Sequence, residues 1–391
     1  MEADVTRGEY IDPKAGREYV GSFGSRWLAL QRLSTASRKK YESVLRLHVE
    51  PHFRKRRVKT VKPSEIDEWL VELESKYGYA TVSAAYRVIC GIFDLAVADE
   101  LRRDNPARAK VVHRPGGGPA ERSPWTAEQA WRIIQEHPEE YRLLPALAVG
   151  CGLRQGEIHG LSIDDIDFDG KVIHVRRQLL VARGRAYFKL PKYGKTRTVP
   201  LPDWVAHQIR LHVGRAKPRP YSLPWEEEDG KVAKELFTCN LLLRWSGPAN
   251  ETLRGPSRKD PRTYDKHVAP TIYNDGVWKP ALSRVGLIPP PVLDEENRVR
   301  YLTDSRLTGI HMLRHLYTTI LMDAGVSLIG IIVILGHSRK GAMARIAPTT
   351  LGTYGHVTDE TYEAARQAVG KTVFRLRAVP DGTVTEQRAA Q

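Results

Sequence analysis

The stretch Gly152-Leu153-Arg154-Gln155-Gly156-Glu157 reads as a turn that enters a helix. An apolar run at 143–149 precedes it and predicts a buried helix. Glu157 stands three positions after Arg154, so the two side chains would share one face of the helix that begins there. The stretch therefore predicts a guanidinium group beside a carboxylate. A carboxylate that only compensates the helix N-terminus is the plainer alternative.

Four more motifs in the second half of the chain carry polar side chains suited to one kind of chemistry. Two arginines, a lysine and two histidines suit an oxyanion with several charges, and a tyrosine hydroxyl can act as a nucleophile. The nucleic-acid backbone, a phosphodiester, is the target that fits this set. The motifs are Lys192 in a basic segment read as a hairpin, His311-Met312-Leu313-Arg314-His315, Leu335-Gly336-His337-Ser338 and Thr353-Tyr354-Gly355-His356.

Phosphodiester cleavage requires positive charge on the non-bridging oxygens and a proton for the leaving oxygen. Arg154 and Arg314 suit the first task, because the planar guanidinium fork can grip two phosphate oxygens and keeps its charge. A buried structural arginine is the alternative for each.

In their order and flanking residues, these motifs resemble those of the tyrosine recombinases, the phage-integrase family, over about residues 22 to 375. The resemblance implies an α+β fold that is mainly α with a small antiparallel β-sheet. An all-α, SAM-like core-binding domain and a tyrosine-recombinase catalytic domain would clamp duplex DNA between them. The resemblance also implies strand cleavage and rejoining through a 3′-phosphotyrosine, with no metal, ATP or other cofactor.

The resemblance assigns the nucleophile and two histidines. Tyr354 would attack the phosphate, and His311 would hydrogen-bond the phosphate or take the tyrosine proton. His337 would hydrogen-bond the phosphate, with a helix-capping histidine as the alternative. Seventeen positions separate His337 from Tyr354, which is longer than the family's usual spacing, with residues 339–347 as extra material. This insertion either leaves the tyrosine in place or lets its segment swing further before it docks.

Supporting residues and the general acid also follow from the resemblance. Glu157 would support its neighbouring cations, and His315, one position past the second arginine, would pack or support the site. Lys192 is chosen as the general acid to the leaving 5′ oxygen, because it lies a few residues before a strand that ends in proline. Lys195 is the second choice and Lys189 the third, and a phosphate contact without catalysis is the alternative role.

The 391-residue chain has a formal net charge of +15, which indicates a polyanionic partner, nucleic acid before membrane. Hydrophobic content of 41% with 27% charged residues is normal for a globular protein of two or three domains. The three cysteines are isolated, so neither a zinc site nor a disulfide framework is expected. No apolar leader or membrane-length run is expected. A bacterial cytoplasmic, nucleoid-associated protein is predicted.

Composition and periodicity, together with the resemblance, divide the chain into five expected segments. Residues 1–21 are a linker tail, 22–110 a core-binding domain, 111–123 a linker, 124–379 a catalytic domain and 380–391 a disordered tail. The arm-binding domain of many integrases is expected to be absent, whether removed or naturally missing. A basic stretch is predicted to contact DNA phosphates, with a solvated charged face as the alternative. Its residues are Arg38, Lys39, Lys40, Arg54, Lys55, Arg56 and Arg57.

Periodicity predicts the elements of both domains. Helices are expected at 23–33, 36–49 and 81–101, with a further helix that has Ser64 as its N-cap. Thr126 and Gln129 form a capping box ahead of another helix. Strands are expected at 171–175, 187–190 and 196–199, the last two joined by 191–195. A surface insertion is expected near 220–265 or 287–306.

The implied partners are double-stranded DNA at attachment or core sites, three further copies in a homotetramer on DNA, and a possible directionality factor. The helical tail at 359–375 would pack on a neighbouring protomer. A type IB topoisomerase and a Xer-type dimer resolvase share this chemistry, and a non-catalytic DNA-binding regulator is the alternative of another class. The run Asp164-Asp165-Ile166-Asp167 could mimic a two-metal nuclease cluster but is predicted to serve a turn and a cap.

Overall fold

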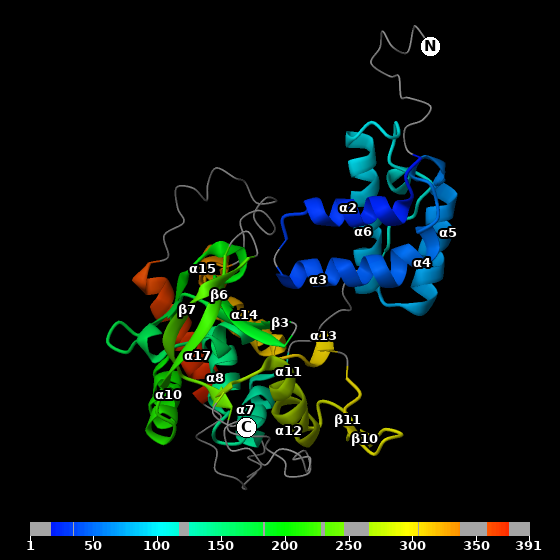
Figure 1. The fold of residues 1–391 in the computed structure, drawn as a ribbon. Coiled ribbons are helices and arrows are strands. Elements are labelled where there is room, and N and C mark those ends of the chain that lie inside the picture. The colour runs from blue at the N-terminus through cyan, green and yellow to red at the C-terminus, as the bar shows by residue number, and fades with distance from the viewer. Residues whose placement is uncertain are drawn as a thin grey trace, which may run out of the picture. The chain divides into compact units, whose positions relative to one another are not determined.

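The computed structural model describes residues 17–33, 35–116, 125–182, 184–227, 231–245, 266–303, 305–336 and 358–374 (Figure 1). The chain forms two compact units. The first consists of Met1–Arg122 with Glu228–Lys231, and the second of Ser123–Glu227 with Val232–Gln391. Each unit has its own hydrophobic core.

The first unit is helical, and apolar residues at three- and four-residue steps form its core. Phe23, Trp27, Phe53, Trp69 and Ile89 are among the buried side chains. The helices are α2 (Val20–Leu30), α3 (Thr35–Val44), the π-helical turn η1 (Leu45–Val49), α4 (Glu50–Phe53), α5 (Pro63–Lys76) and α6 (Tyr79–Ala98), with short 3₁₀ turns η2 (Val58–Thr60) and η3 (Pro106–Arg108).

Two predictions about these helices need correction. Ser64 is not an N-cap, because α5 already begins at Pro63, a residue suited to the first helical position, and Lys62 precedes it. The backbone N–H of Lys62 donates to the Glu65 carboxylate at 2.8 Å. Among the described helices, α6 has the length and apolar composition of a membrane span, against expectation. Its apolar face instead packs into the core of the unit.

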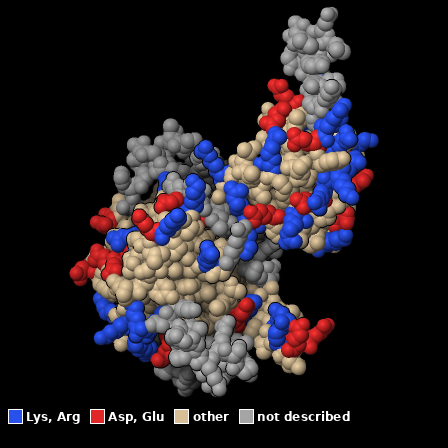
Figure 2. All heavy atoms as spheres, viewed as in Figure 1, with Lys and Arg blue, Asp and Glu red and all other residues tan. Residues whose placement is uncertain are grey.

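The basic stretch of the first unit is divided between two places. Helices α3, η1 and α4 follow one another without a break, so Lys39 and Lys40 lie about 20 Å along one helical run from the cluster at 54–57. Arg38 donates to the backbone carbonyls of Leu28 and Gln31 at 3.0 and 2.9 Å, and so holds the end of α2. Figure 2 shows lysine and arginine side chains along the flank of this unit on which α5 lies.

The core of the second unit is built around α8 (Leu143–Cys151), whose residues are all buried. Helix α8 packs against α7 (Ala127–Glu136), α10 (Asp203–Arg215) and α14 (His311–Asp323). The predicted capping box of α7 is confirmed, since Thr126 Oγ1 accepts from the Gln129 N–H and Gln129 Oε1 accepts from the Thr126 N–H. The other helices are α9 (Gln155–His159), α11 (Pro270–Tyr273), η8 (Asn274–Trp278), α12 (Lys279–Val285), α13 (Ser305–Thr308), α15 (Leu328–Leu335) and α17 (Asp359–Phe374).

In the described part of this unit, two sheets have three or more strands. The first is antiparallel, in the order β1 (Ile166–Asp167), β2 (Val172–Val175) and β5 (Arg197–Pro200). The second has the order β3 (Gln178–Ala182), β4 (Arg185–Lys189), β6 (Arg219–Glu226) and β7 (Val232–Leu241), with β4 parallel to β6. Two-stranded pairs are formed by β8 (Arg244–Trp245) with β9 (Lys266–His267), and by β10 (Val292–Leu293) with β11 (Val299–Arg300).

The predicted hairpin around Lys192 is wrong. Strands β4 and β5 exist, but β4 pairs with β3 and β6, whereas β5 pairs with β2. Lys192 begins a 3₁₀ turn, η5 (Lys192–Gly194), that crosses from one sheet to the other. Strand β3, which was not predicted from the sequence, pairs with β4 in place of β5. In the expected insertion, β6 and β7 add a hairpin to the sheet, and 246–265 lie outside the described residues.

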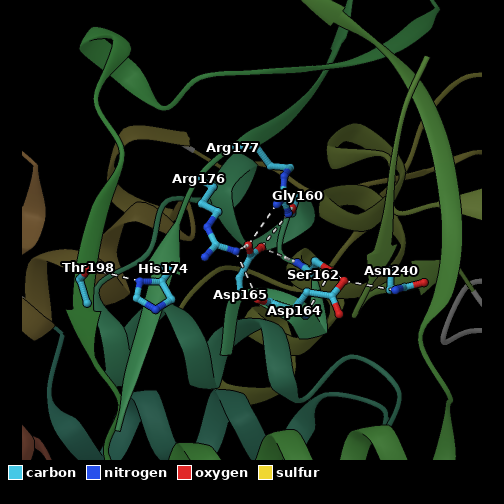
Figure 3. Close-up of polar contacts among 9 residues, drawn as sticks. All are labelled: Gly160, Ser162, Asp164, Asp165, His174, Arg176, Arg177, Thr198 and Asn240. Atoms are coloured by element: carbon cyan, nitrogen blue, oxygen red, sulfur yellow. Dashed lines mark hydrogen bonds and ion pairs between the residues drawn. The ribbon is translucent and has the colours of Figure 1, made fainter. Parts of the chain in front are cut away.

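The acidic run at 164–167 serves caps and a turn, as predicted. Ser162 caps the 3₁₀ turn η4 (Ile163–Asp165), and its N–H donates to the Asp165 carboxylate at 2.9 Å. Figure 3 shows Arg176 and Arg177 reaching the same carboxylate, and Arg177 makes two bonds, at 2.6 and 3.0 Å. Asp164 instead accepts from Ser162 Oγ and from the Asn240 amide. The two carboxylates therefore share Ser162 but otherwise bind different partners, arginines at Asp165 and Asn240 at Asp164.

The C-terminal helix and the cysteines complete the second unit. Helix α17 packs on α14, α10, α7 and β5 of its own unit, and its packing on a neighbouring protomer stays a prediction. All three cysteines are buried and unbridged, Cys90 in α6, Cys151 in α8 and Cys239 in β7.

Replacing Gly152 by alanine should destabilise the second unit by about 2–4 kcal/mol. Gly152 ends α8 with φ of +63°, and a Cβ there would lie 2.5 Å from the Tyr317 ring. Urea unfolding followed by tryptophan fluorescence measures the change. Gly214→Ala, in α10 with no atom within 4 Å of the new Cβ, is the matched control and should change stability by less than about 1 kcal/mol. Equal stability of the two variants would contradict the prediction.

Candidate active site

A buried carboxylate, that of Glu157, lies at the centre of the candidate site; its side chain is 1% exposed. Arg154 precedes α9 as its N-cap residue, and its backbone N–H donates to Glu157 Oε2 at 2.9 Å. Its Nη1 donates to Glu157 Oε1 at 3.0 Å. The structure therefore places the two side chains together, as their separation of three positions in the sequence predicts.

Arg197, on β5, is a site residue that the sequence reading missed. Its Nη1 and Nη2 donate to Glu157 Oε1 and Oε2, both at 2.8 Å, in a bidentate pair. Its Nε donates to the carbonyl of Ile334 at 2.9 Å. The available signal was the strand alternation, because Arg197 shares a face of β5 with the fully buried Val199. A charged residue on the buried face of a strand requires a partner.

Arg314, on α14, brings a third guanidinium to the same place. It is buried, and its Nη1 lies 4.0 Å from Glu157 Oε2. Its Nη1 also donates to the carbonyl of Gly152, and its Nη2 donates to the carbonyl of Leu335 at 2.6 Å. Backbone carbonyls therefore accept hydrogen bonds from both Nη groups of Arg314. The predicted grip of Arg314 on a phosphate stays a prediction.

The charges in this cluster shift one another's pKa values. Burial alone would raise the pKa of Glu157, but the hydrogen bonds and charge of Arg197, with those of Arg154, hold it at about 2. Burial lowers the pKa of Arg314 to about 9, with the positive charges of Arg154 and Arg197 acting in the same direction. Glu157 and Arg314 are therefore both ionised near neutral pH, and three guanidinium groups against one carboxylate give the cluster a net positive charge.

The three lysines considered as the general acid lie in different surroundings. Lys189 forms an ion pair with the buried carboxylate of Glu226, its neighbour across the β4–β6 pairing. Lys189 therefore has a structural role, as the partner of a buried carboxylate. Lys192 and Lys195 are both exposed, in and just after the turn that leads into β5. Because β5 carries Arg197, this turn lies only a few residues from the arginine cluster.

The histidines and tyrosines of α14 divide clearly by burial. His311 is exposed at the first position of α14, and its ring lies edge-on to the ring of His315 with centroids 4.7 Å apart. Tyr317 is fully buried, and burial raises the pKa of its phenol, so it belongs to the core, as predicted. His337 and Tyr354 lie outside the described residues.

The arrangement suits an anion with more than one charge. Arg154 keeps 18% of its side chain exposed, and it is held by Glu157, whose carboxylate is in turn bound by Arg197. An oxyanion at Arg154 would meet a fixed guanidinium backed by two further cations. In the part of the chain that the structure describes, no group of three histidine, cysteine or acidic side chains is arranged to hold a metal ion.

Family comparison agrees with this architecture. The sequence model described as phage integrase central domain matches residues 21–111, and the one described as phage integrase family matches residues 125–225. Arg154, Glu157, Lys192 and Arg197 fall within the second match, whereas Arg314 lies beyond it.

Individual relatives are similar to this chain over a larger part of its length than the two family models. The transposase from transposon Tn916 of Enterococcus faecalis is 24% identical over 83% of this chain and 70% of its own length. The Tn1549 transposon integrase in complex with circular intermediate DNA superposes with a TM-score of 0.62 at 20% identity, over 88% of this chain and 98% of that chain. A lambda integrase tetramer bound to a Holliday junction gives a TM-score of 0.54 at 14% identity, over 86% and 85%.

Replacing Glu157 by glutamine should lower the free energy of unfolding of the second unit by about 3–5 kcal/mol at pH 7, because the buried arginines lose their counter-charge. Folding lowers the pKa of this carboxylate from 4.5 to about 2, so its stabilisation is complete above pH 4.5 and is lost as the pH falls toward 2. The difference between variant and wild type should therefore shrink over that interval.

Urea unfolding at pH 7, 4.5 and 3 measures this difference. Glu363→Gln removes an exposed carboxylate that pairs with Arg366 on α17, and this control should change stability little at any of these pH values. A stability difference for Glu157→Gln that stays constant from pH 7 to pH 3 would be incompatible with the assigned role.

Proposed function

This chain belongs to the phage integrase family of tyrosine recombinases, which are DNA strand-transferring enzymes, and we propose that it is a site-specific recombinase of a mobile element. It cleaves and rejoins DNA strands at attachment sites with Tyr354 as the nucleophile. The observation that carries the proposal is the gathering of Arg154, Arg197 and Arg314 about the single carboxylate of Glu157.

The proposed chemistry has two transesterification steps. The Tyr354 hydroxyl gives up its proton and its oxygen attacks the scissile phosphorus. A bond between the tyrosine oxygen and phosphorus forms, the bond between phosphorus and the 5′ oxygen breaks, and that oxygen leaves with a proton, so that the 3′ end is held as a phosphotyrosine. The 5′ hydroxyl of a partner strand then attacks the phosphotyrosine, and the tyrosine leaves. Each step exchanges one phosphate ester for another, so bond energy is retained and neither ATP nor a metal ion is required.

Each of these side chains has a proposed role that its chemistry supports. Arg154 and Arg314 neutralise the non-bridging oxygens, and His311 and His337 hydrogen-bond the phosphate or move the tyrosine proton. Lys192 protonates the leaving 5′ oxygen, which its exposed place on the turn before β5 permits. Glu157 and His315 act through these groups as supports.

The proposed partners are duplex DNA and three further copies of the chain. The net charge of +15 favours duplex DNA, and lambda integrase has been seen as a tetramer on a Holliday junction. A directionality factor and a cytoplasmic location near the nucleoid complete the proposal. Two basic segments of the first unit contact phosphates from separate places, Lys39 and Lys40 on α3 and the cluster at 54–57 after α4.

Wild-type protein should form a covalent adduct with a suicide duplex, and Tyr354→Phe should reduce the adduct to background, because phenylalanine has no oxygen to attack phosphorus. The duplex is the DNA segment that the protein protects, nicked close to the scissile phosphate so that the freed strand diffuses away. Denaturing gel electrophoresis detects the adduct. An adduct that persists in Tyr354→Phe means that another residue is the nucleophile.

The same preparation separates the competing functions. Strand exchange between two distinct duplexes supports a recombinase, whereas relaxation of supercoiled DNA without exchange supports a type IB topoisomerase. Specific binding by a wild-type chain that forms no adduct supports a regulator. Exchange confined to two copies of one chromosomal site supports a dimer resolvase.

Lys192→Ala should slow cleavage of an ordinary duplex by about 10²–10⁴-fold, the usual contribution of a general acid. A duplex with sulfur at the bridging 5′ position should restore most of the rate, since a thiol with a pKa of about 8.5 leaves without protonation. Single-turnover rates on both duplexes measure the rescue. Lys195→Ala serves as the control, and an equal defect of Lys192→Ala on both duplexes would remove Lys192 from this role.

A further inference from the structure

The bidentate pair between Arg197 and Glu157 has no part in the proposed transesterification steps. We propose that Arg197 is a positioning residue for strand cleavage, which fixes Glu157 in the orientation that aims Arg154 and fixes the end of α15, two residues before His337. This inference rests on the proposed function and adds a residue to the same site.

The first part of the argument is the way in which the carboxylate is shared. Glu157 Oε1 accepts from Arg154 Nη1 at 3.0 Å and from Arg197 Nη1 at 2.8 Å. Glu157 Oε2 accepts from the Arg154 backbone N–H at 2.9 Å and from Arg197 Nη2 at 2.8 Å. Each oxygen thus serves both arginines. A turn of the carboxylate that releases Arg197 also releases Arg154.

The second part concerns the C-terminal end of α15. The last carbonyls of a helix have no partner within it. Arg197 Nε donates to the carbonyl of Ile334, and Arg314 Nη2 donates to the next carbonyl, that of Leu335. Gly336 follows in the left-handed conformation, and a Cβ there would lie 2.7 Å from Arg197 Cδ. Arg197 therefore both bonds to this turn and packs beneath it.

The third part is that these contacts need the shape of arginine as well as its charge. Two parallel Nη bonds to one carboxylate and an Nε bond in another direction require a planar fork with several donors. The ammonium group of lysine keeps the charge but cannot make this set of bonds. Arg197→Lys therefore separates the geometry of the side chain from its charge.

The chain supplies a matched control in the pair between Arg177 and Asp165. Arg177 also makes a bidentate bond to a buried carboxylate, at 2.6 and 3.0 Å, and also donates to a backbone carbonyl, that of Gly160 (Figure 3). Arg177 and Arg197 are 6% and 7% exposed, and their acidic partners are each 1% exposed. Neither Arg177 nor Asp165 bonds to Arg154, Glu157 or Arg314 in the described structure.

The experiment compares single-turnover cleavage of the suicide duplex by the full chain at saturating protein. Arg197→Lys should lower the cleavage rate at least tenfold, while its Kd for the duplex stays within about threefold of wild type. Arg177→Lys should cleave within about threefold of wild type. Thermal unfolding of both variants verifies that they lose similar stability, so a purely structural cost would affect both rates alike.

A pH profile provides a readout that a general loss of stability does not move. In Arg197→Gln, burial still raises the pKa of Glu157, and among the described residues Arg154 before α9 and Arg314 on α14 remain to oppose that rise. The carboxylate should then protonate at higher pH, where it no longer orients Arg154. Cleavage by Arg197→Gln should fall on the acid side at a higher pH than cleavage by wild type or Arg177→Lys.

Each outcome decides one hypothesis. Equal cleavage rates and equal pH profiles for the Arg197 and Arg177 variants would overturn the positioning role. If Arg197→Lys does not fold, Arg197→Gln and its pH profile carry the test. A wild-type chain that forms no adduct overturns the proposed function instead, so the two failures are distinguishable.

Discussion

The arrangement of the second unit depends on one buried carboxylate. Three guanidinium groups, from the residue before α9, from β5 and from α14, lie around Glu157. Three positive charges around one point repel one another, and that repulsion opposes the convergence of these elements. The carboxylate makes that convergence favourable and leaves a surplus of positive charge. Stability and the proposed phosphate chemistry therefore depend on the same contact, and a substitution at Glu157 is expected to change both.

The local features of the site were predictable from the sequence, because neighbours along the chain set them. The spacing of Arg154, the N-cap residue of α9, and Glu157 brings their side chains together, the Thr126–Gln129 box starts α7, and Gly336 ends α15. The mainly helical fold with small sheets is likewise as predicted. What could not be read from local pattern is the pairing of distant segments. Strand β3 takes the place beside β4 that the predicted hairpin would fill, and β5 consequently joins β2 and brings Arg197 into the site.

For the basic residues of the first unit, too, the local pattern was predictable from the sequence and the contacts between distant residues were not. Their charge and position in the sequence predict a phosphate-contacting face. The sequence does not show which of these cations bond to other groups of the same unit. Arg38 holds the end of α2, and Arg56 pairs with Glu65 at 2.5 Å. An uninterrupted helical run from α3 to α4 separates the other members. A polyanion would therefore meet two smaller groups of cations instead of one continuous surface.

The three buried thiols have a chemical consequence. Burial raises the pKa of Cys90, of Cys151 and, to about 11, of Cys239. Alkylating reagents and peroxides attack the thiolate, so the native chain resists both at neutral pH. Loss of structure frees the sulfur atoms to ionise normally. Reagent uptake at Cys90 reports the opening of one unit, and uptake at Cys151 or Cys239 reports the opening of the other. The molecule thus carries an intrinsic, residue-resolved sensor of its own unfolding.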